Sequence, residues 1–225
     1  EEPAGSARSV DARMKRTRAD LPLEAVDLEC PTSKREEILA SFIALQRTGT
    51  LCDISIYVGS RTFSAHQLVL AAASPFFKAL IVDQRFSESS SGKVHLQEMS
   101  EDAFECVLEF LYTQKCTLSS DALLQPVLEA ACRLRVESLQ VAAEAAIITR
   151  LSPGSCLNAW NLADHFCLTA LAASAKEIAL SRFDDVALES GDSFATLRAS
   201  QLSELLADDG LGIDSEESAY RALER

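Results

Sequence analysis

Hydrophobic and polar residues alternate along residues 51–58, and this alternation predicts a β-strand. Ile54, Ile56 and Val58 fall on the face that would point into a core. A glycine and a serine follow, which favour a tight turn, and Arg61–Phe63 is long enough to form the return strand. The stretch therefore predicts a β-hairpin that buries one face.

Beyond the hairpin, apolar residues recur every three or four positions, which is typical of amphipathic helices. A shorter β-rich stretch at 94–96 interrupts this pattern. Helices are predicted at about 34–46, 68–73, 75–80, 101–112, 121–134, 136–151, 157–167, 172–183, 202–206 and 214–225, with a further short element from Phe194. The chain is therefore expected to be mainly α with a small β-sheet, an α+β fold.

Helix starts are marked by residues whose side chains accept hydrogen bonds from the first backbone amides. Ser33 and Glu36 have the spacing of a capping box before the helix at 34–46. Ser74 precedes Pro75, which combines an N-cap with a proline at the first helical position. Ser100 is placed to cap the helix at 101–112.

Three regions follow from these patterns. Residues 1–33 are polar and aperiodic, and we expect a disordered N-terminal tail. Residues 34–150 hold the hairpin and most of the helices, and Ser152-Pro153-Gly154 then separates an all-helical region at 151–225. The last predicted helix ends at Arg225 without a cap, so we expect the chain to be a fragment of a longer protein.

Charge and composition narrow the class of protein. The formal net charge is −13, which argues against a nucleic-acid-binding surface because phosphate binding requires basic side chains. No apolar run is long enough for a membrane span and no secretory signal is recognised, so we expect a cytoplasmic protein. The basic cluster Arg13–Arg18 favours nuclear import as an alternative, although a solvated tail is the simpler interpretation.

The sequence offers no recognisable catalytic, metal or cofactor site. Its seven cysteines include no C-x-x-C pair, and they are interpreted as reduced thiols, with Cys30 the most exposed. His66 would suit a general base, but no nucleophile motif adjoins it, so we expect it to bond locally within the fold. We therefore predict a non-enzymatic protein without cofactors.

Several short motifs occur in a fixed order along the chain, and this order is more specific than any single motif. Leu51-Cys-Asp-Ile, Phe63-Ser-Ala-His and Leu70-Ala-Ala-Ala-Ser-Pro-Phe-Phe resemble the BTB (POZ) domain of Kelch-like proteins. Cys156–Phe166, then Phe183-Asp-Asp-Val and Gln201-Leu-x-x-Leu-Leu, resemble the BACK domain, whose first helix pair is called the 3-box. The resemblance implies a BTB fold at 34–150, followed by an all-α 3-box and partial BACK domain at 151–225, with any Kelch repeats beyond this chain.

The resemblance also implies a homodimer, because the family's first helix packs on the partner subunit. The alternative is that this apolar stripe packs on its own core. In the family a basic residue follows the Ala-His pair and balances the strand aspartate, Asp53; here Gln67 stands there, which puts a charge-pair role for Asp53 in doubt. The expected interface residues are Ile38, Leu39, Phe42, Leu45, Leu68, Ala72 and Phe76.

A second implied partner is cullin-3. Cullin-binding BTB domains carry a hydrophobic-x-Glu pattern, which is matched here by Phe86-Ser87-Glu88; packing of Phe86 on its own core is the alternative. Tyr112 lies in a turn expected to adjoin that segment, and Leu157 and Phe166 represent the 3-box.

The resulting interpretation is a dimeric substrate adaptor of a cullin-3 RING ubiquitin ligase, with its protein substrate unknown. The main alternative is a BTB dimerisation or scaffold module of a cytoskeletal or transcription-regulating protein. An enzyme of unrecognised type is the third and weakest interpretation.

Overall fold

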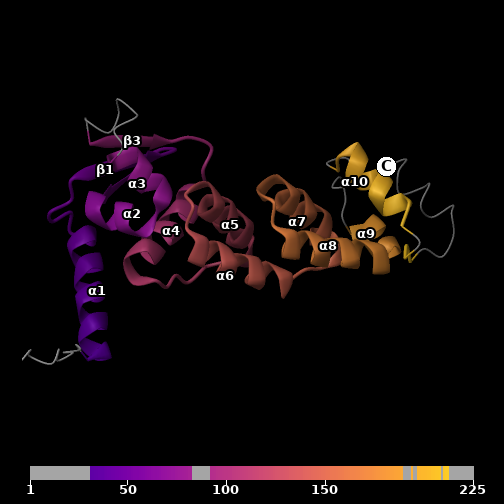
Figure 1. The fold of residues 1–225 in the computed structure, drawn as a ribbon, viewed down its shortest axis with the longest axis horizontal. Coiled ribbons are helices and arrows are strands. Elements are labelled where there is room, and N and C mark those ends of the chain that lie inside the picture. The colour runs from indigo at the N-terminus through magenta and orange to yellow at the C-terminus, as the bar shows by residue number, and fades with distance from the viewer. Residues whose placement is uncertain (1–30, 83–91, 190–193, 195–196, 209, 213–225) are drawn as a thin grey trace, which may run out of the picture.

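A computed structural model describes residues 31–82, 92–189, 194, 197–208 and 210–212. The described part is an elongated body with a small sheet at one end and successive helices toward the other (Figure 1). The predicted α+β class is confirmed. The elements are α1 (Thr32–Arg47), β1 (Ile54–Val58), β2 (Arg61–Ala65), α2 (Gln67–Ala73), α3 (Pro75–Val82), β3 (Lys93–Leu96), α4 (Glu101–Thr113), η3 (Asp121–Leu123), α5 (Leu124–Arg133), α6 (Glu137–Ile148), α7 (Pro153–Phe166), α8 (Thr169–Ser181), α9 (Phe183–Glu189) and α10 (Ala199–Leu206).

The predicted hairpin supplies two strands of a three-stranded sheet in the order β2-β1-β3, with β1 in the centre. β1 pairs antiparallel with β2 and parallel with β3, which places Ile56 between Phe63 and Val94. These three side chains are buried, because alternate residues of each strand point to the same face. The sheet therefore supplies one apolar layer of the N-terminal core.

The hairpin turn is tied to the first turn of α4. The Glu101 carboxylate accepts hydrogen bonds from the Ser60 backbone N–H at 2.6 Å and the Ser60 hydroxyl at 2.9 Å. These two bonds are the main reason why the pKa of Glu101 lies below its usual value. Arg61 continues the contact with ion pairs to Asp102 and Glu105. The turn is thus fixed against the helix that carries the largest share of the N-terminal core.

Two hydrophobic cores follow one another along the described chain. The first joins the sheet to α2, α3 and α4, and the second joins α7, α8, α9 and α10. α5 and α6 take part in both cores: Val127 and Leu139 belong to the first, whereas Leu128 and Ile147 belong to the second. This helical hairpin therefore connects the two regions as a shared packed layer.

Polar side chains hold the far end of the second region. Gln201 is almost fully buried, donates through Nε2 to Asp164 Oδ2 at 2.8 Å, and accepts from the Arg198 backbone N–H at 2.9 Å. Lys176 forms ion pairs with Glu204 and Asp208. These contacts fasten α10 onto α7 and α8.

Two of the three predicted helix caps are confirmed. The Ser74 hydroxyl accepts from the Phe77 N–H at 3.2 Å, and the Ser100 hydroxyl accepts from the Ala103 N–H at 3.4 Å. The predicted capping box at Ser33 is wrong, because α1 already begins at Thr32 after Pro31, and no side chain caps it. A proline with fixed φ precedes this helix, which starts two residues before the sequence pattern indicates. The predicted helix at 214–225 lies outside the described residues.

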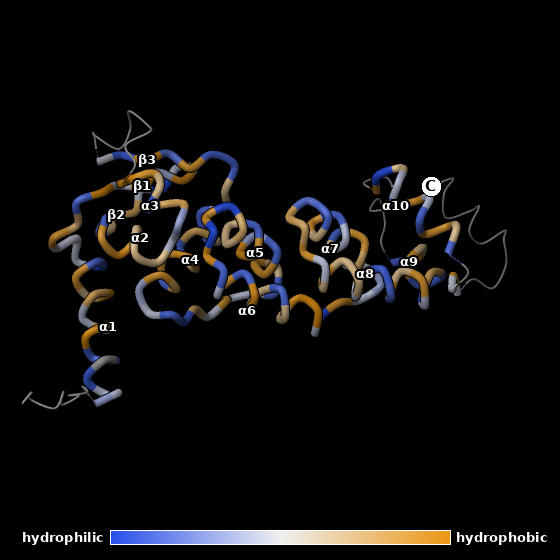
Figure 2. Tube along the Cα trace, in the orientation of Figure 1, coloured by the Kyte–Doolittle hydropathy of each residue, from blue (hydrophilic) through white to orange (hydrophobic). Residues whose placement is uncertain are grey.

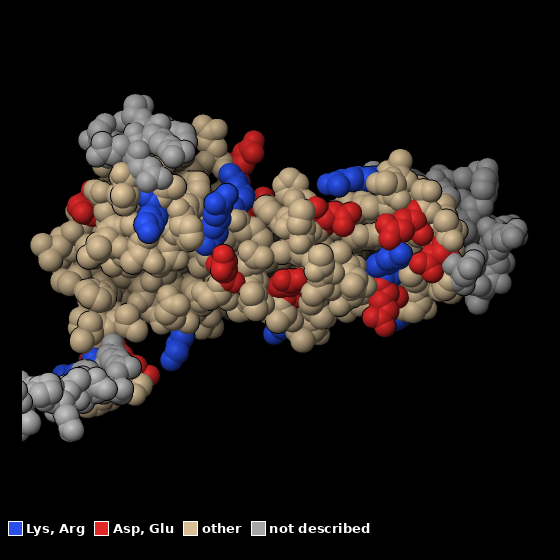
Figure 3. Space-filling model, viewed as in Figure 1, with Lys and Arg blue, Asp and Glu red and all other residues tan. Residues whose placement is uncertain are grey.

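The length of the helices and the charge on the surface bear on whether this part of the chain could span a membrane or bind nucleic acid. In the ranges given above, no helix is both long and apolar enough to cross a bilayer. On the face drawn in Figure 3, acidic and basic side chains are interspersed rather than gathered into a basic stripe.

Candidate protein-interaction surfaces

Helix α1 stands away from the body and leaves its apolar stripe exposed. Its last turn is attached by the Gln46 side chain, which donates to the Ser64 carbonyl oxygen at 2.8 Å, and by an Arg47–Glu109 ion pair at 3.7 Å. Figure 2 shows apolar positions along the helix although most of it projects outward from the body. The side chains of Ile38, Leu39 and Phe42 are 51%, 39% and 41% exposed. The alternative that this stripe packs on its own core is therefore not what the structure shows for these three residues.

An apolar groove lies beside this stripe, and we call it the α1–α2 groove. Its volume is about 480 Å³. Among the described residues that line it, none carries a carboxylate, ammonium, guanidinium or imidazole group. The lining residues are Leu39, Phe42, Leu68, Val69, Ala72, Ala73, Leu111, Tyr112, Gln114, Val136 and Ser138.

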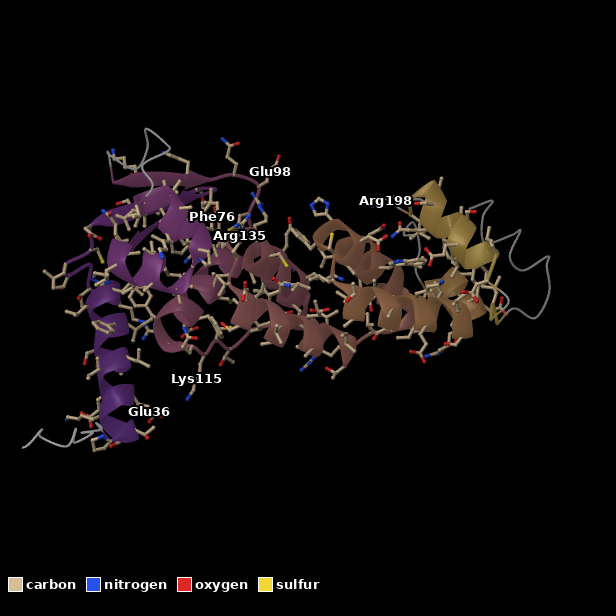
Figure 4. All side chains as sticks on the ribbon, viewed as in Figure 1. Glu36, Phe76, Glu98, Lys115, Arg135 and Arg198 are labelled. Carbon is tan, nitrogen blue, oxygen red and sulfur yellow. The ribbon has the colours of Figure 1, made fainter. Side chains whose placement is uncertain are left out.

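The structure gathers most of the predicted dimer-interface residues on this face. Leu68 is 80% exposed, Ala72 is exposed and Leu45 is half-buried. Phe76 is the exception: it lies on α3, stacks edge-on against Phe77, and is drawn well apart from α1 in Figure 4. Ser74 adopts an extended conformation between the two helices, so the helical spacing that links Leu68 and Ala72 does not continue to Phe76.

His66 lies behind the groove in a closed hydrogen-bond network. Its Nε2 faces the Thr50 carbonyl oxygen at 3.0 Å, and its Nδ1 faces the Tyr112 hydroxyl at 2.8 Å. A carbonyl oxygen only accepts, so the ring proton is assigned to Nε2 and the tyrosine hydroxyl donates to Nδ1. The same hydroxyl oxygen accepts from the His66 backbone N–H at 2.9 Å. The prediction that His66 bonds locally is confirmed.

Cys52 adjoins this network without forming a nucleophile–base pair. Its sulfur lies 3.8 Å from His66 Nε2, but that nitrogen carries the proton donated to Thr50 and has no lone pair for the thiol. Burial, followed by the negative charge of Asp53, raises the pKa of Cys52 and favours the neutral thiol. Cys52 is therefore a packing residue in this arrangement.

Gln67 takes the place of a charged partner for Asp53. The Gln67 backbone N–H donates to Asp53 Oδ1 at 2.7 Å, and the Gln67 Nε2 donates to the Asp53 carbonyl oxygen at 3.0 Å. Asp53 is exposed to solvent. Two hydrogen bonds from Gln67 therefore join Asp53, which directly precedes the first strand, to the start of α2.

The structure does not bring the predicted cullin-binding residues together on one exposed surface of the described residues. Phe86, Ser87 and Glu88 lie outside the described residues. Tyr112 and Leu157 are buried in the first and second cores, so neither offers a broad contact surface. Phe166 is half-buried at the end of α7 and stacks edge-on against His165.

A second hollow, which no pattern in the sequence predicts, lies where the two regions meet, and we call it the junction hollow. It has a volume of about 330 Å³, and Arg150 crosses its rim to form an ion pair with Asp121 at 3.3 Å. The hollow is formed by two separate segments of the chain, residues 121–125 and residues 147–155, so periodicity within one element does not reveal it. Its lining residues are Asp121, Ala122, Leu124, Gln125, Ile147, Arg150, Leu151, Ser152 and Ser155.

Other chemistry in the described residues is limited. All six cysteines there are free thiols, and Cys30 lies outside this part of the chain. No group of three or more histidine, cysteine, aspartate or glutamate side chains in the described ranges is arranged to hold a metal ion.

Comparison with known proteins agrees with the two regions. Residues 42–151 match the family described as BTB/POZ domain, and residues 156–225 match that described as BTB And C-terminal Kelch, abbreviated BACK. A solved structure, the BTB domain of zebrafish PATZ1, is 24% identical with a TM-score of 0.47, covering 54% of this chain and 98% of that one.

Curated relatives cover both regions together. Mouse Kelch-like protein 17 is 32% identical over 81% of this chain and 28% of its own length. Human Kelch-like protein 38 is 32% identical over 83% of this chain and 31% of its own length. The chain thus spans less than a third of the length of these relatives. With a BTB domain followed directly by a BACK domain, this chain belongs to the Kelch-like family.

Proposed function

We propose that this chain is the dimeric adaptor part of a cullin-3 RING ubiquitin ligase. The observation that carries the proposal is the succession of a BTB and a BACK domain joined through the shared α5–α6 layer in a Kelch-like chain. The chain would do no chemistry itself. It would hold a protein substrate, bound by a domain beyond this chain, near the charged ubiquitin carrier and so raise the effective concentration of the substrate.

The dimer is supported by the shape and charge of the α1–α2 face. A projecting apolar helix and an apolar groove lie on the same side of one chain. A two-fold interface uses the same patch on both subunits, so a ridge beside a groove is self-complementary. The groove lining carries no formal charge, which avoids like-charge repulsion between two chains of net charge −13.

Cullin binding is proposed to use Phe86-Ser87-Glu88 together with the surface where the BTB and BACK regions meet. The junction hollow, with a volume of about 330 Å³, lies on the surface between the BTB and BACK regions. An extended segment of the cullin would fit into it. Leu157 is proposed to support this surface from within the second core, where it is buried, whereas Tyr112 lies in the first core and lines the α1–α2 groove.

The test is calorimetric titration of the chain with the cullin-3 N-terminal domain, after light scattering has given the molar mass. We expect one cullin per protomer of a dimer, with affinity between nanomolar and low micromolar. Phe86→Ala with Glu88→Ala should weaken binding by at least about tenfold while the dimer persists. Leu188→Ala with Glu189→Ala is the matched control, because it removes one apolar side chain and one glutamate from α9.

A second candidate function is a BTB dimerisation or scaffold module without a ligase role. The burial of Tyr112 and Leu157 favours it, because two of the residues implied as cullin contacts are largely inaccessible. A dimer that does not bind the cullin in the same titration would make this the leading function.

A further inference from the structure

A cleft lies between the last turns of α1, strand β2, helix α4 and the segment that follows α4, and we call it the α4 cleft. Its volume is about 650 Å³, which is within the size range of clefts that hold ligands. It shares no lining residue with the α1–α2 groove or the junction hollow. The dimer and cullin contacts proposed above involve other residues.

Three carboxylates of α4 line one wall of this cleft, and we call them the α4 acidic row. Asp102, Glu105 and Glu109 are spaced three and four residues apart, so they lie on one face of the helix, where like charges repel one another. The pKa of the Cys106 thiol, which also lines the cleft, is raised, first by burial, then by Cys116 and by all three carboxylates. The negative charge of the row therefore reaches into the cleft.

Arginine side chains balance the α4 acidic row only in part. Arg61 forms ion pairs with Asp102 at 3.3 Å and Glu105 at 2.9 Å, and Arg47 lies 3.7 Å from Glu109. The three carboxylate side chains are between 40% and 70% exposed, and ion pairs of such groups contribute at most about 1 kcal/mol each. Each carboxylate has two oxygen atoms and several lone pairs, so the row can accept further cationic donors.

The rest of the cleft is apolar at its base and uncharged at its sides. Phe63 and Leu108 are buried and line it, and the hydroxyl groups of Thr62, Ser64 and Thr117 also belong to the lining. A wall of carboxylates above apolar side chains suits a peptide segment in which cations flank an apolar residue. A strongly acidic or uniformly apolar segment would lack this complementarity.

The chain itself contains a segment of this composition. Residues 13–18 read Arg-Met-Lys-Arg-Thr-Arg, with four basic residues, an apolar Met14 and no acidic residue. Thirteen residues separate Arg18 from Thr32, and at about 3.3 Å per residue they span up to about 45 Å. Helix α1 has 16 residues and is therefore about 24 Å long. The connection is thus long enough to return along α1 to the cleft at its last turns.

We propose that the α4 cleft is the docking site for the basic segment Arg13–Arg18 of the same chain. The cations of the segment meet the α4 acidic row, and Met14 meets the apolar base. A docked segment is withheld from any partner that recognises basic residues, including a nuclear import receptor. The inference goes beyond the proposed ligase role and does not depend on the dimer.

The first test is limited trypsin digestion of the 225-residue chain, followed by mass spectrometry, with cleavage after Arg16 as the readout. Glu105→Gln with Glu109→Gln removes two charges of the α4 acidic row. Glu137→Gln with Glu177→Gln is the matched control, because it makes the same change in net charge at exposed positions of α6 and α8. We expect cleavage to be at least about fivefold faster in the α4 variant and to change less than about twofold in the control, since the rate follows the undocked population.

Cleavage after Arg8 is the internal reference, because Arg8 lies outside the basic segment. Its rate should be the same in all three chains. In about 1 M sodium chloride, where the Debye length is about 3 Å, the wild-type rate after Arg16 should rise to that of the α4 variant. Equal rates after Arg16 in the wild-type chain and the α4 variant at low salt overturn the inference.

A second test uses the wild-type chain and needs no substitution that could alter folding. Lys15 is the only lysine before Lys34 in the sequence. Carbodiimide activation joins an amine directly to a carboxylate, so it couples groups that are in contact. We expect Lys15 to be joined to the α4 acidic row within single chains, as mapped by mass spectrometry of the monomer band. Coupling of Lys15 that is equally frequent at the two control glutamates, or that occurs only in covalent dimers, overturns the inference.

Discussion

Replacing Tyr112 by phenylalanine should destabilise the BTB domain although it removes a single oxygen atom. The side chain is 1% exposed, and phenylalanine preserves its packing in the first core. The change leaves the His66 backbone N–H and Nδ1 without the hydroxyl that bonds both, at 2.9 and 2.8 Å. A buried polar group that loses its partner costs about 1–3 kcal/mol. Because His66 is only half-buried, water compensates in part, and we expect the free energy of unfolding to fall by about 1–3 kcal/mol in total.

Tyr112 also makes the free energy of unfolding depend on pH, and the direction of its pKa shift determines the sign of that dependence. Burial raises the pKa of Tyr112 to about 12 from an ordinary value of 10, so the folded state favours the neutral phenol. The neutral form therefore contributes stability that is fully present below pH 10 and is lost as pH rises toward 12. A shift of this size corresponds to about 3 kcal/mol across that window. Phenylalanine does not ionise, so this part of the alkaline loss should vanish in Tyr112→Phe.

The assay is urea unfolding followed by far-ultraviolet circular dichroism, at one protein concentration because dimerisation shifts apparent stability. Measurements at pH 8 give the cost of the substitution, and a series up to pH 11 gives the slope. Tyr57→Phe is the control: its ring stacks on His95 at the sheet surface, and we expect a change within about 0.5 kcal/mol. A Tyr112→Phe loss below about 0.5 kcal/mol, or an unchanged alkaline slope, would refute the proposed network.

Three further substitutions test the packing that positions the surfaces. Ser74→Ala removes a fully buried hydroxyl that donates to the Leu134 carbonyl and caps α3, and should lower the urea-unfolding free energy by about 1–3 kcal/mol. Gln201→Met breaks the bond to Asp164, and should raise amide hydrogen exchange in α10 by at least about tenfold while α4 exchange is unchanged. Leu171→Ala opens a cavity in the second core and should lower the calorimetric stability by about 2–5 kcal/mol; a loss below about 1 kcal/mol would contradict its full burial.

Local patterns were sufficient for most of the fold. Alternation at Ile54, Ile56 and Val58 predicted β1, and the serines at 74 and 100 predicted two helix starts, because these effects act over a few residues. The start of α1 was misplaced because the fixed φ of Pro31 outweighed the pairing expected between Ser33 and Glu36.

The candidate surfaces were predicted less completely, because they combine residues that are distant in sequence. The family resemblance grouped Leu39, Phe42 and Leu68 in one interface, and all three line the α1–α2 groove. It also grouped Phe76 with them, but Phe76 lies on α3, beyond the extended residue Ser74 that follows α2. The Tyr112–His66 contact joins residues 46 positions apart, and no periodicity reveals it.

The outward position of α1 has a consequence for synthesis of the protein. Its last turn packs on β2 and α4, which are translated later, and its first turns have few contacts within the chain. At ribosomal rates of about 5–20 residues per second, the 66 residues between Arg47 and the end of α4 at Thr113 require about 3–13 seconds. During that interval the apolar stripe precedes the strand and the helix that hold the last turn of α1. Two neighbouring nascent chains on one messenger RNA would meet through these helices first, so pairing during translation would favour copies of the same protein over mixed pairs.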